Sequence, residues 1–230
     1  NVRPYGAYLY NNGDIIFISD KAGDYSSISK ISKNSEIIWT KNYNPHHWFS
    51  ILDEKVYFSD RKFISQEKLK EKYKFNFLNC KKDSINYEPI RIEDIIIINA
   101  NYGNVLNEIS ILDIFSRNPS FKKHALDCID PFHINDVIVI DKIMTKKFDK
   151  DYNINVGDIL VSIRNMNLLI IFDPISLKIK WSLCCNFFMQ HSPRITNNNS
   201  IIVFDNLGGN YYSRLMEFDI NSKELLGFYI

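Results

Sequence analysis

The chain has 230 residues, of which 45% are hydrophobic and 14% aromatic, and its formal net charge is +1. This length can bury a substantial core, and β-rich domains of this size are commonly single units. The nearly neutral charge gives no indication of a nucleic-acid partner, and no apolar run approaches the roughly 20 residues that would span a bilayer.

Polar turns that lead directly into apolar or alternating strands recur along the chain. Five of these units begin at Gly13, Asp53, Glu93, Gly157 and Asn199, so their spacings are 40, 40, 64 and 42 residues. A second hairpin follows in most units, which gives each repeat about four short strands. A period near 40 residues with four strands per unit is typical of a β-propeller blade.

The sequence therefore predicts an all-β fold, a single β-propeller domain over residues 1–230 with four to five visible blades. We expect the closed ring to need more chain than this. The alternative all-β architecture, a β-sandwich, does not explain why Trp39 and Trp181 recur at the end of a unit, shortly before His47 and His191. The expected blades are residues 1–45, 46–86, 87–130, 131–188 and 189–230.

Two stretches interrupt the period. Residues 60–92 contain a basic segment in which a helix is expected over 65–73, and residues 141–156 separate two strands of one hairpin. A second helix is expected over 110–117. Long insertions in a repeat usually lie on one face, often the binding face, although a tolerated surface loop is the alternative.

The four cysteines are spaced neither as metal ligands nor as a CxxC redox pair. Adjacent Cys184 and Cys185 point to opposite faces of a strand, and a bridge between neighbours would be strained. We therefore expect small buried or half-buried thiols at Cys80, Cys128, Cys184 and Cys185.

Three of the five histidines, His47, His133 and His191, each open a short run of β-forming residues at the same phase of the repeat. Because a strand alternates its faces, equal phase puts these side chains on equal faces of equivalent strands. Each run follows the preceding hairpin, which is the position of an innermost propeller strand, and innermost strands line the central channel. We therefore expect the three imidazoles to converge in the channel, with Tyr5 at the same offset in the first unit.

Arginines occupy a second repeated position. Arg164 lies seven residues after Gly157, and Arg61 lies seven residues after Glu54. A guanidinium beside a histidine cluster suits a tetrahedral oxyanion such as sulfate or phosphate, which it can bind through two parallel hydrogen bonds.

The histidine cluster has three interpretations. The first is that each ring makes a hydrogen bond within its own blade. The second is a zinc site, since three imidazoles plus water are a common catalytic set, although no carboxylate shares the phase and Asp136 is only close to it. The third is covalent catalysis, in which one neutral imidazole attacks the central atom of an anionic ester while the other rings and Arg164 stabilise the charge.

Several short motifs follow one another along the chain, and their combined order is more specific to a family than any single motif. They are the pair His46-His47, Asp130-Pro-Phe-His133-Ile-Asn-Asp-Val, Gly157-Asp-Ile-Leu-Val-Ser-Ile-Arg164-Asn-Met-Asn, Asp173-Pro, Lys180-Trp-Ser-Leu, Gln190-His191-Ser-Pro and Ile202-Val-Phe-Asp-Asn206. In this order they resemble the bacterial arylsulfotransferase family. The resemblance covers most of the chain and is strongest from residue 127 to 230.

The resemblance implies a six-bladed propeller with an active site in a central funnel. It also implies transfer of a sulfuryl group from an aryl sulfate ester to a phenol, without a nucleotide sulfate donor, by a ping-pong route through a sulfated histidine. No metal or other cofactor is implied. Carried over by motif, His191 is the nucleophile, and His133, Arg164 and one of His46 or His47 bind the sulfuryl oxygens and polarise the phenolic oxygens. The phase argument favours His47.

The partners implied are an aryl sulfate donor and a phenolic acceptor, with a homodimer as a further expectation and a location in the periplasm or on an extracytoplasmic membrane surface. The chain departs from the family at Trp48, where an aspartate usually follows the second paired histidine, and Ser192 follows His191. Two alternatives come from other classes. One is a non-catalytic propeller that binds an anionic or aromatic ligand in the same funnel, and the other is a zinc hydrolase that uses the same imidazoles.

Overall fold

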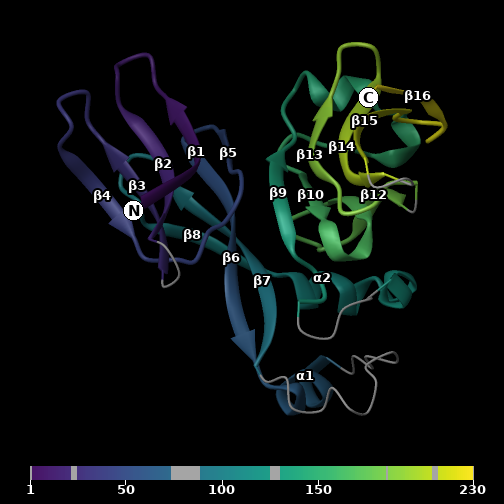
Figure 1. Ribbon diagram of the computed structural model, residues 1–230, viewed down its shortest axis with the longest axis horizontal. Helices are drawn as coiled ribbons and strands as arrows, with labels where there is room; N and C mark the ends of the chain where they lie inside the picture. The colour runs from purple at the N-terminus through teal and green to yellow at the C-terminus, as the bar shows by residue number, and fades with distance from the viewer. Residues whose placement is uncertain are drawn as a thin grey trace.

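The computed structural model describes residues 2–21, 25–73, 89–124, 130–184, 186–208 and 212–229. These residues form four antiparallel sheets of four strands each, placed around a common middle as the blades of a β-propeller (Figure 1). Within each sheet the strands pair in chain order, so every blade is a meander. The predicted all-β propeller is confirmed.

The blades are numbered in chain order. Blade 1 consists of β1 (Val2–Leu9), β2 (Ile15–Lys21), β3 (Tyr25–Ile31) and β4 (Ile37–Lys41). Blade 2 consists of β5 (Ser50–Leu52), β6 (Lys55–Ile64), β7 (Ile90–Asn99) and β8 (Val105–Ser110). Blade 3 consists of β9 (Ile134–Val139), β10 (Ile159–Ile163), β11 (Leu168–Phe172) and β12 (Ile179–Cys184). Blade 4 consists of β13 (His191–Ile195), β14 (Ser200–Gly208), β15 (Tyr212–Asp219) and β16 (Leu225–Tyr229).

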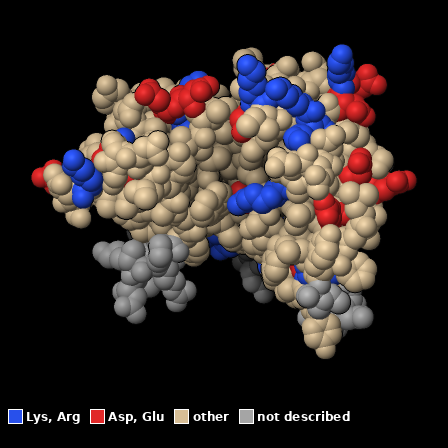
Figure 2. Space-filling view, turned by 90° about the horizontal axis from the view of Figure 1, so that it is seen from above, with Lys and Arg blue, Asp and Glu red and all other residues tan. Residues whose placement is uncertain are grey.

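The innermost strand of each blade is its first one. Strands β1, β5, β9 and β13 face one another across the middle of Figure 1, and β9 contacts both β5 and β13. Seen from above, the middle of the molecule is hollowed (Figure 2). The ends of the innermost strands therefore surround one central channel.

The boundary expected between residues 86 and 87 is wrong. Strand β7 contains Glu93 and pairs with β6 along its whole length, so residues 46–86 and 87–130 contribute to one sheet. Asp53 and Glu54, with φ of 49° and 58°, do form the expected tight turn, whereas Glu93 is a buried residue in mid-strand. An acidic residue before an apolar run has the sequence pattern of a turn, and the insertion inside the β6–β7 hairpin makes the spacing of the units look regular.

Both predicted helices are present. They are α1 (Gln66–Tyr73), which lies between β6 and β7, and α2 (Ile111–Arg117), which follows β8 directly. Helix is not confined to these two, because short 3-10 segments also occur. These are η2 (Pro119–His124), η3 (Met144–Lys147), η4 (Lys150–Tyr152) and η5 (Arg164–Met166).

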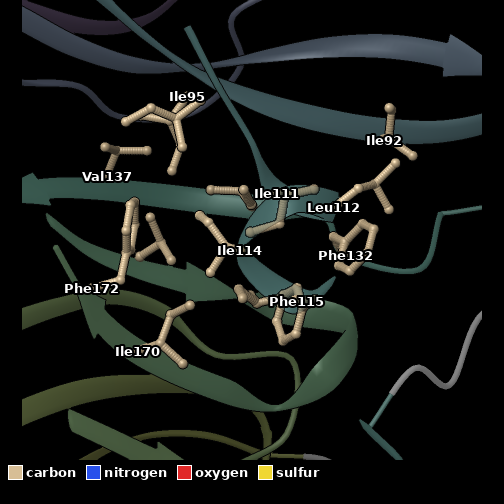
Figure 3. Packing of buried hydrophobic residues seen from close by; sticks show 14 of the residues in the cluster. Ile92, Ile95, Ile111, Leu112, Ile114, Phe115, Phe132, Val137, Ile170 and Phe172 are labelled. Carbon is tan, nitrogen blue, oxygen red and sulfur yellow. The ribbon is translucent and has the colours of Figure 1, made fainter. Parts of the chain in front are cut away.

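Helix α2 fills the space between blades 2 and 3. Its four apolar residues, Ile111, Leu112, Ile114 and Phe115, are completely buried. Figure 3 shows them between Ile92 and Ile95 of β7 on one side and Val137, Ile170 and Phe172 of blade 3 on the other. The ring of Phe115 stacks on Phe132 with centroids 5.5 Å apart. This packing fixes the backbone immediately before His133.

The two recurring tryptophans have the same role in two blades. Trp39, in the last strand of blade 1, donates a hydrogen bond from Nε1 to the carbonyl of Ala100 in blade 2 at 3.2 Å. Trp181, in the last strand of blade 3, donates to the carbonyl of Ile220 in blade 4 at 2.7 Å. Each buried indole therefore joins the outer part of its blade to the next blade, which accounts for the recurrence seen in the sequence.

Within the described residues, no helix combines the length and the apolar character needed to cross a membrane. Cys184 is half-buried, as expected. The other three cysteines, Cys80, Cys128 and Cys185, lie outside the described residues.

Candidate active site

Four imidazoles meet where the innermost strands of blades 2, 3 and 4 begin. The ring centroid of His47 lies 4.7 Å from His46, 5.5 Å from His133 and 5.5 Å from His191. The rings of His46 and His133 are 5.3 Å apart, and Tyr5 of β1 stacks on His47 at 6.1 Å. The convergence predicted from the phase of the repeat is therefore present.

The backbone is strained at equivalent positions. His47, three residues before β5, and His133, directly before β9, both have left-handed φ angles, 68° and 52°. Met189 and Ser192, on either side of His191, have φ of 52° and 49°. Non-glycine residues in this region cost about 1–3 kcal/mol each and cluster at binding and catalytic sites, where the surrounding structure holds them.

His191 is oriented by the backbone of Met189. Its Nδ1 lies 2.9 Å from the carbonyl oxygen of Met189. A carbonyl can only accept a hydrogen bond, so Nδ1 carries the proton and the lone pair of the neutral ring is on Nε2. The same Met189 accepts a hydrogen bond at Sδ from Nη2 of Arg164 at 3.1 Å, so one residue positions both His191 and Arg164.

The segment that carries His191 is anchored in blade 3. The fully buried amide of Gln190 donates to the carbonyls of Ile163 and Leu168 at 3.1 and 3.2 Å. The amide of Asn135 in β9 donates to the carbonyl of Gln190 at 2.6 Å. Blade 3 therefore holds both the side chain and the backbone of Gln190, and this fixes the position of His191 at the start of blade 4.

His133 forms a pair with a carboxylate that the phase argument did not assign. Nδ1 of His133 lies 2.6 Å from Oδ2 of Asp130, and Nη1 of Arg91 donates to the same oxygen at 3.2 Å. Burial acts to raise the pKa of Asp130, but the hydrogen bond and charge of His133, together with Arg91, outweigh it and lower this pKa. Asp130 is therefore ionised at neutral pH. In the sequence, the feature that could have indicated this pair is the position of Asp130 three residues before His133.

Asp136 does not join the histidines. Its Oδ2 lies 2.9 Å from Nη1 of Arg194, and burial raises its pKa to about 6 in spite of that arginine. Arg194 itself lies three residues beyond His191 on β13. The carboxylate considered for a zinc site thus belongs to a separate ion pair further along the channel.

The imidazoles of His46, His47 and His191 are held neutral. Burial is the largest cause that lowers the pKa of His47, to about 3, and the charges of His133, His191, Arg61 and Arg164 lower it further. Burial also lowers the pKa of His46 and His191, with Arg61 the next cause for His46 and Arg164 contributing for His191. A neutral ring is the form that can act as a nucleophile.

A buried glutamate lies behind His46. Oε1 of Glu93 is 3.9 Å from Nε2 of His46, and the side chain of Glu93 is fully buried. Burial and the charge of Asp130 raise the pKa of Glu93 to about 8, although Arg61 and Arg91 lower it. Glu93 is therefore mostly protonated at neutral pH and adds little negative charge to the site.

The same cluster has the residue types of a metal site. His46, His47 and His133 each offer one nitrogen, and these atoms lie within 4.8 Å of one another. However, the charges of Arg61 and Arg164 act on the same rings. Fixed positive charges repel a dication and attract an anion, so the surroundings suit an oxyanion better than zinc.

The β-propeller gathers histidines where its innermost strands begin, and Arg61 of β6 and Arg164 of η5 add positive charge to them, a combination that suits an anion. The family description Arylsulfotransferase (ASST) matches residues 7–226, and the chain belongs to this family. No curated protein matches the sequence.

Three solved structures share the fold. A protein of unknown function from Bacteroides caccae has a TM-score of 0.54 and 10% identity, and the match covers 99% of this chain and 66% of that one. A catalytically inactive histidine-to-alanine variant of virginiamycin B lyase from Staphylococcus aureus, crystallised with quinupristin, has a TM-score of 0.53 and 13% identity over 99% of this chain and 55% of that one. The selenomethionine form of the same lyase has a TM-score of 0.52 and 13% identity, covering 100% of this chain and 60% of that one. The chain thus spans less than two thirds of the length of each.

Proposed function

We propose that the protein moves a sulfuryl group from an aryl sulfate ester to a phenol through a sulfated His191. The observation that carries this proposal is the tautomer of His191, in which Met189 holds Nδ1–H and leaves the Nε2 lone pair free. Membership of the arylsulfotransferase family supports the reaction class. The depressed pKa of His191 supports a neutral nucleophile at working pH.

In the first half-reaction, Nε2 of His191 attacks sulfur, an N–S bond forms and the bond from sulfur to the aryl oxygen breaks. The leaving phenolic oxygen takes a proton from Nε2 of His133, whose Nδ1 faces the carboxylate of Asp130. In the second half-reaction the acceptor phenol returns a proton to His133 while its oxygen attacks sulfur and the N–S bond breaks. The transferring group carries charge on its oxygens, so fixed positive groups supply much of the stabilisation.

Arg164 and His47 are the proposed binders of the sulfuryl oxygens. The ring of His47 lies 5.5 Å from both His133 and His191, and Arg164 lowers the pKa of His47 as well as that of His191. The side chain of His46 is only 4% exposed and instead lies against Glu93. This arrangement supports the choice of His47 over His46 as the residue that meets substrate.

The test is a labelling experiment with an aryl sulfate and no acceptor. The full-length protein should retain one sulfuryl group, on the peptide that contains His191, and His191→Ala should abolish both labelling and turnover. Ser192→Ala is the matched control, because it removes the neighbouring hydroxyl and should label normally. If His191→Asn labels and turns over like the parent, His191 is structural, and a non-catalytic propeller that binds an anionic or aromatic ligand becomes the better interpretation.

The remaining expectations from the family are proposals of the same kind. The protein would act on the periplasmic or outer side of a membrane, as a monomer or a homodimer, on small aryl sulfates and phenols. Cell fractionation of the full-length protein and sedimentation of the purified protein test the location and the oligomeric state. Activity that persists in a chelator would exclude the zinc hydrolase alternative.

A further inference from the structure

A cavity lies further along the central channel than the histidines. It has a volume of about 260 Å³ and is walled by Tyr8 of β1, Trp48 and Phe49 before β5, Ile138 of β9, and Arg194 and Ile195 of β13. Tyr8 follows Tyr5 by three residues, and Arg194 follows His191 by three. His191 and Arg194 pair with Phe204 and Ile202, so a shift in register makes this stretch advance by only about two strand steps, and the cavity lies roughly 7 Å further along β13 than His191. Figure 2 views this end of the channel, where Lys and Arg side chains lie beside the hollow.

The walls are aromatic and aliphatic, with one charge. Tyr8 and Trp48 are 45% and 40% exposed, so their rings are accessible to a ligand that enters the cavity. Among the described residues that line the cavity, Arg194 is the charged one. An apolar ring with a single negative charge therefore matches this lining.

Arg194 is held in place with part of its guanidinium left open. Its Nη1 donates to Oδ2 of Asp136 at 2.9 Å and to the carbonyl of Pro193 at 2.6 Å. The side chain of Asp136 is 1% exposed, so this buried carboxylate holds the guanidinium of Arg194 in a fixed position. Within the described part of the chain, Nε and Nη2 of Arg194 make no hydrogen bond. That free edge has the geometry that binds a carboxylate through two parallel hydrogen bonds.

We propose that this cavity is a ligand site for a small aromatic carboxylate of one or two rings, with the ring between Tyr8, Trp48 and Ile138 and the carboxylate on Arg194. The size supports this class, because 260 Å³ lies just below the range of about 300–1,000 Å³ that is typical of sites for drug-sized ligands. The inference does not depend on sulfuryl transfer, since it uses none of the proposed catalytic residues.

Trp48 provides a reporter for binding. The chain has three tryptophans, and Trp39 and Trp181 are 7% and 2% exposed, whereas Trp48 is 40% exposed. Iodide quenching of tryptophan fluorescence therefore reports mainly on Trp48. The probes are 4-methylbenzoate, the uncharged 4-methylbenzyl alcohol of similar shape, and acetate, each titrated by calorimetry and by protection from iodide.

We expect 4-methylbenzoate to protect Trp48 and to bind about tenfold or more tightly than the alcohol, since a hydrogen bond to a charged group adds about that factor. Acetate should not protect Trp48. Arg194→Gln should reduce the affinity for the carboxylate to that for the alcohol. Arg214→Gln is the matched control, because Arg214 also pairs with a buried aspartate, Asp205, at 2.9 Å but does not line the cavity.

Removal of Arg194 leaves Asp136 without its partner, so a second variant leaves the ion pair intact. Met144 lines the cavity from η3, and Met144→Trp should fill it and abolish binding of both aromatic probes. Calorimetry is the readout for this variant, because the new tryptophan would add to the fluorescence of Trp48. His191→Ala should bind 4-methylbenzoate like the parent, which separates this site from the proposed function. Equal affinity for carboxylate and alcohol, no protection of Trp48, or unchanged binding in Met144→Trp would each overturn the proposal.

Discussion

Oδ2 of Asp130 lies 2.6 Å from Nδ1 of His133, close enough for a charge-assisted hydrogen bond. The pairing sets the direction of the imidazole, because Nδ1 must donate to the carboxylate and Nε2 is left to exchange a proton with the substrate. Arg91 shares the same carboxylate oxygen and so fixes its position.

Replacing this carboxylate should impair turnover while the fold persists. Asp130→Asn removes the charge that holds Nδ1–H, so the wrong tautomer becomes accessible, and the turnover rate should fall by roughly 10²–10⁴. Steady-state rates with an aryl sulfate and a phenol measure the effect. Asp158→Asn is the control, since Asp158 pairs with Lys180 at 2.8 Å just before β10, at the opposite end of that strand from Arg164, and should leave the rate unchanged. Equal rates for Asp130→Asn and the parent would remove His133 from the proton transfer.

Arg164 should act through charge placed on the sulfuryl oxygens. Arg164→Ala should lower the turnover rate by about 10²–10³, the usual loss for one charge-stabilising donor. Arg164→Lys should recover little of the rate, because an ammonium cannot reproduce the planar fork of donors. Both changes keep the backbone hydrogen bond from Arg164 to the carbonyl of His133.

The matched control for Arg164 is Arg117→Ala, which removes an exposed arginine that donates to the carbonyl of Ser176 at 3.1 Å. Thermal unfolding of all three variants separates loss of catalysis from loss of fold. Full activity in Arg164→Ala would show that this arginine does not meet the substrate.

The sequence predicted the meeting of the histidines because their positions are periodic. His47 and His133 precede innermost strands and His191 begins one, so the same place in three blades brings their rings to one channel. The partners that orient them are not periodic. Met189 acts through a carbonyl that any residue has, and Gln190 acts through an amide buried in the neighbouring blade, so neither contact has a signature in the chain.

The misplaced blade boundary has a related cause. Glu93 begins an apolar run, and a charged residue before such a run normally marks a turn. Here the charge is suppressed by burial, and the residue is a fully buried part of β7. A sequence pattern cannot show that a carboxyl is protonated. Glu93 therefore has the pattern of a turn residue although it is a buried residue that packs behind His46.

His47 should make stability depend on pH. Its pKa is about 3 in the folded protein against 6.5 in the unfolded chain, so the unfolded state binds the proton more readily. The stability it contributes is present above pH 6.5 and is lost as the pH falls toward 3. His47→Asn, which tolerates the left-handed backbone, removes this dependence.

The measurement is urea unfolding of the parent and His47→Asn between pH 4 and pH 8. The free energy of unfolding of the parent relative to the variant should fall with decreasing pH, by at most about 1.4 kcal/mol per pH unit. Only the slope of the difference is informative, because the packing lost with the ring adds a constant offset. A difference that stays level between pH 4 and pH 7 would mean that His47 is solvated enough to titrate normally.

Glu93 should show the opposite dependence. Burial raises its pKa from 4.5 to about 8, so the folded protein holds a proton that the unfolded chain releases. The stability it contributes is present below pH 4.5 and is lost as the pH rises toward 8. Glu93→Gln keeps the shape and the neutral charge of the protonated acid. The variant should therefore gain on the parent from pH 5 to about pH 8, again by at most about 1.4 kcal/mol per pH unit, and the difference should level off above that. Glu36→Gln, in the exposed β3–β4 turn, controls for the substitution itself. Urea titrations at each pH give the free energies of unfolding from which the difference is taken. If Glu93→Gln and the parent change in parallel from pH 5 to pH 9, the carboxyl beside His46 is ionised at neutral pH. The site would then carry a negative charge that opposes binding of an anion.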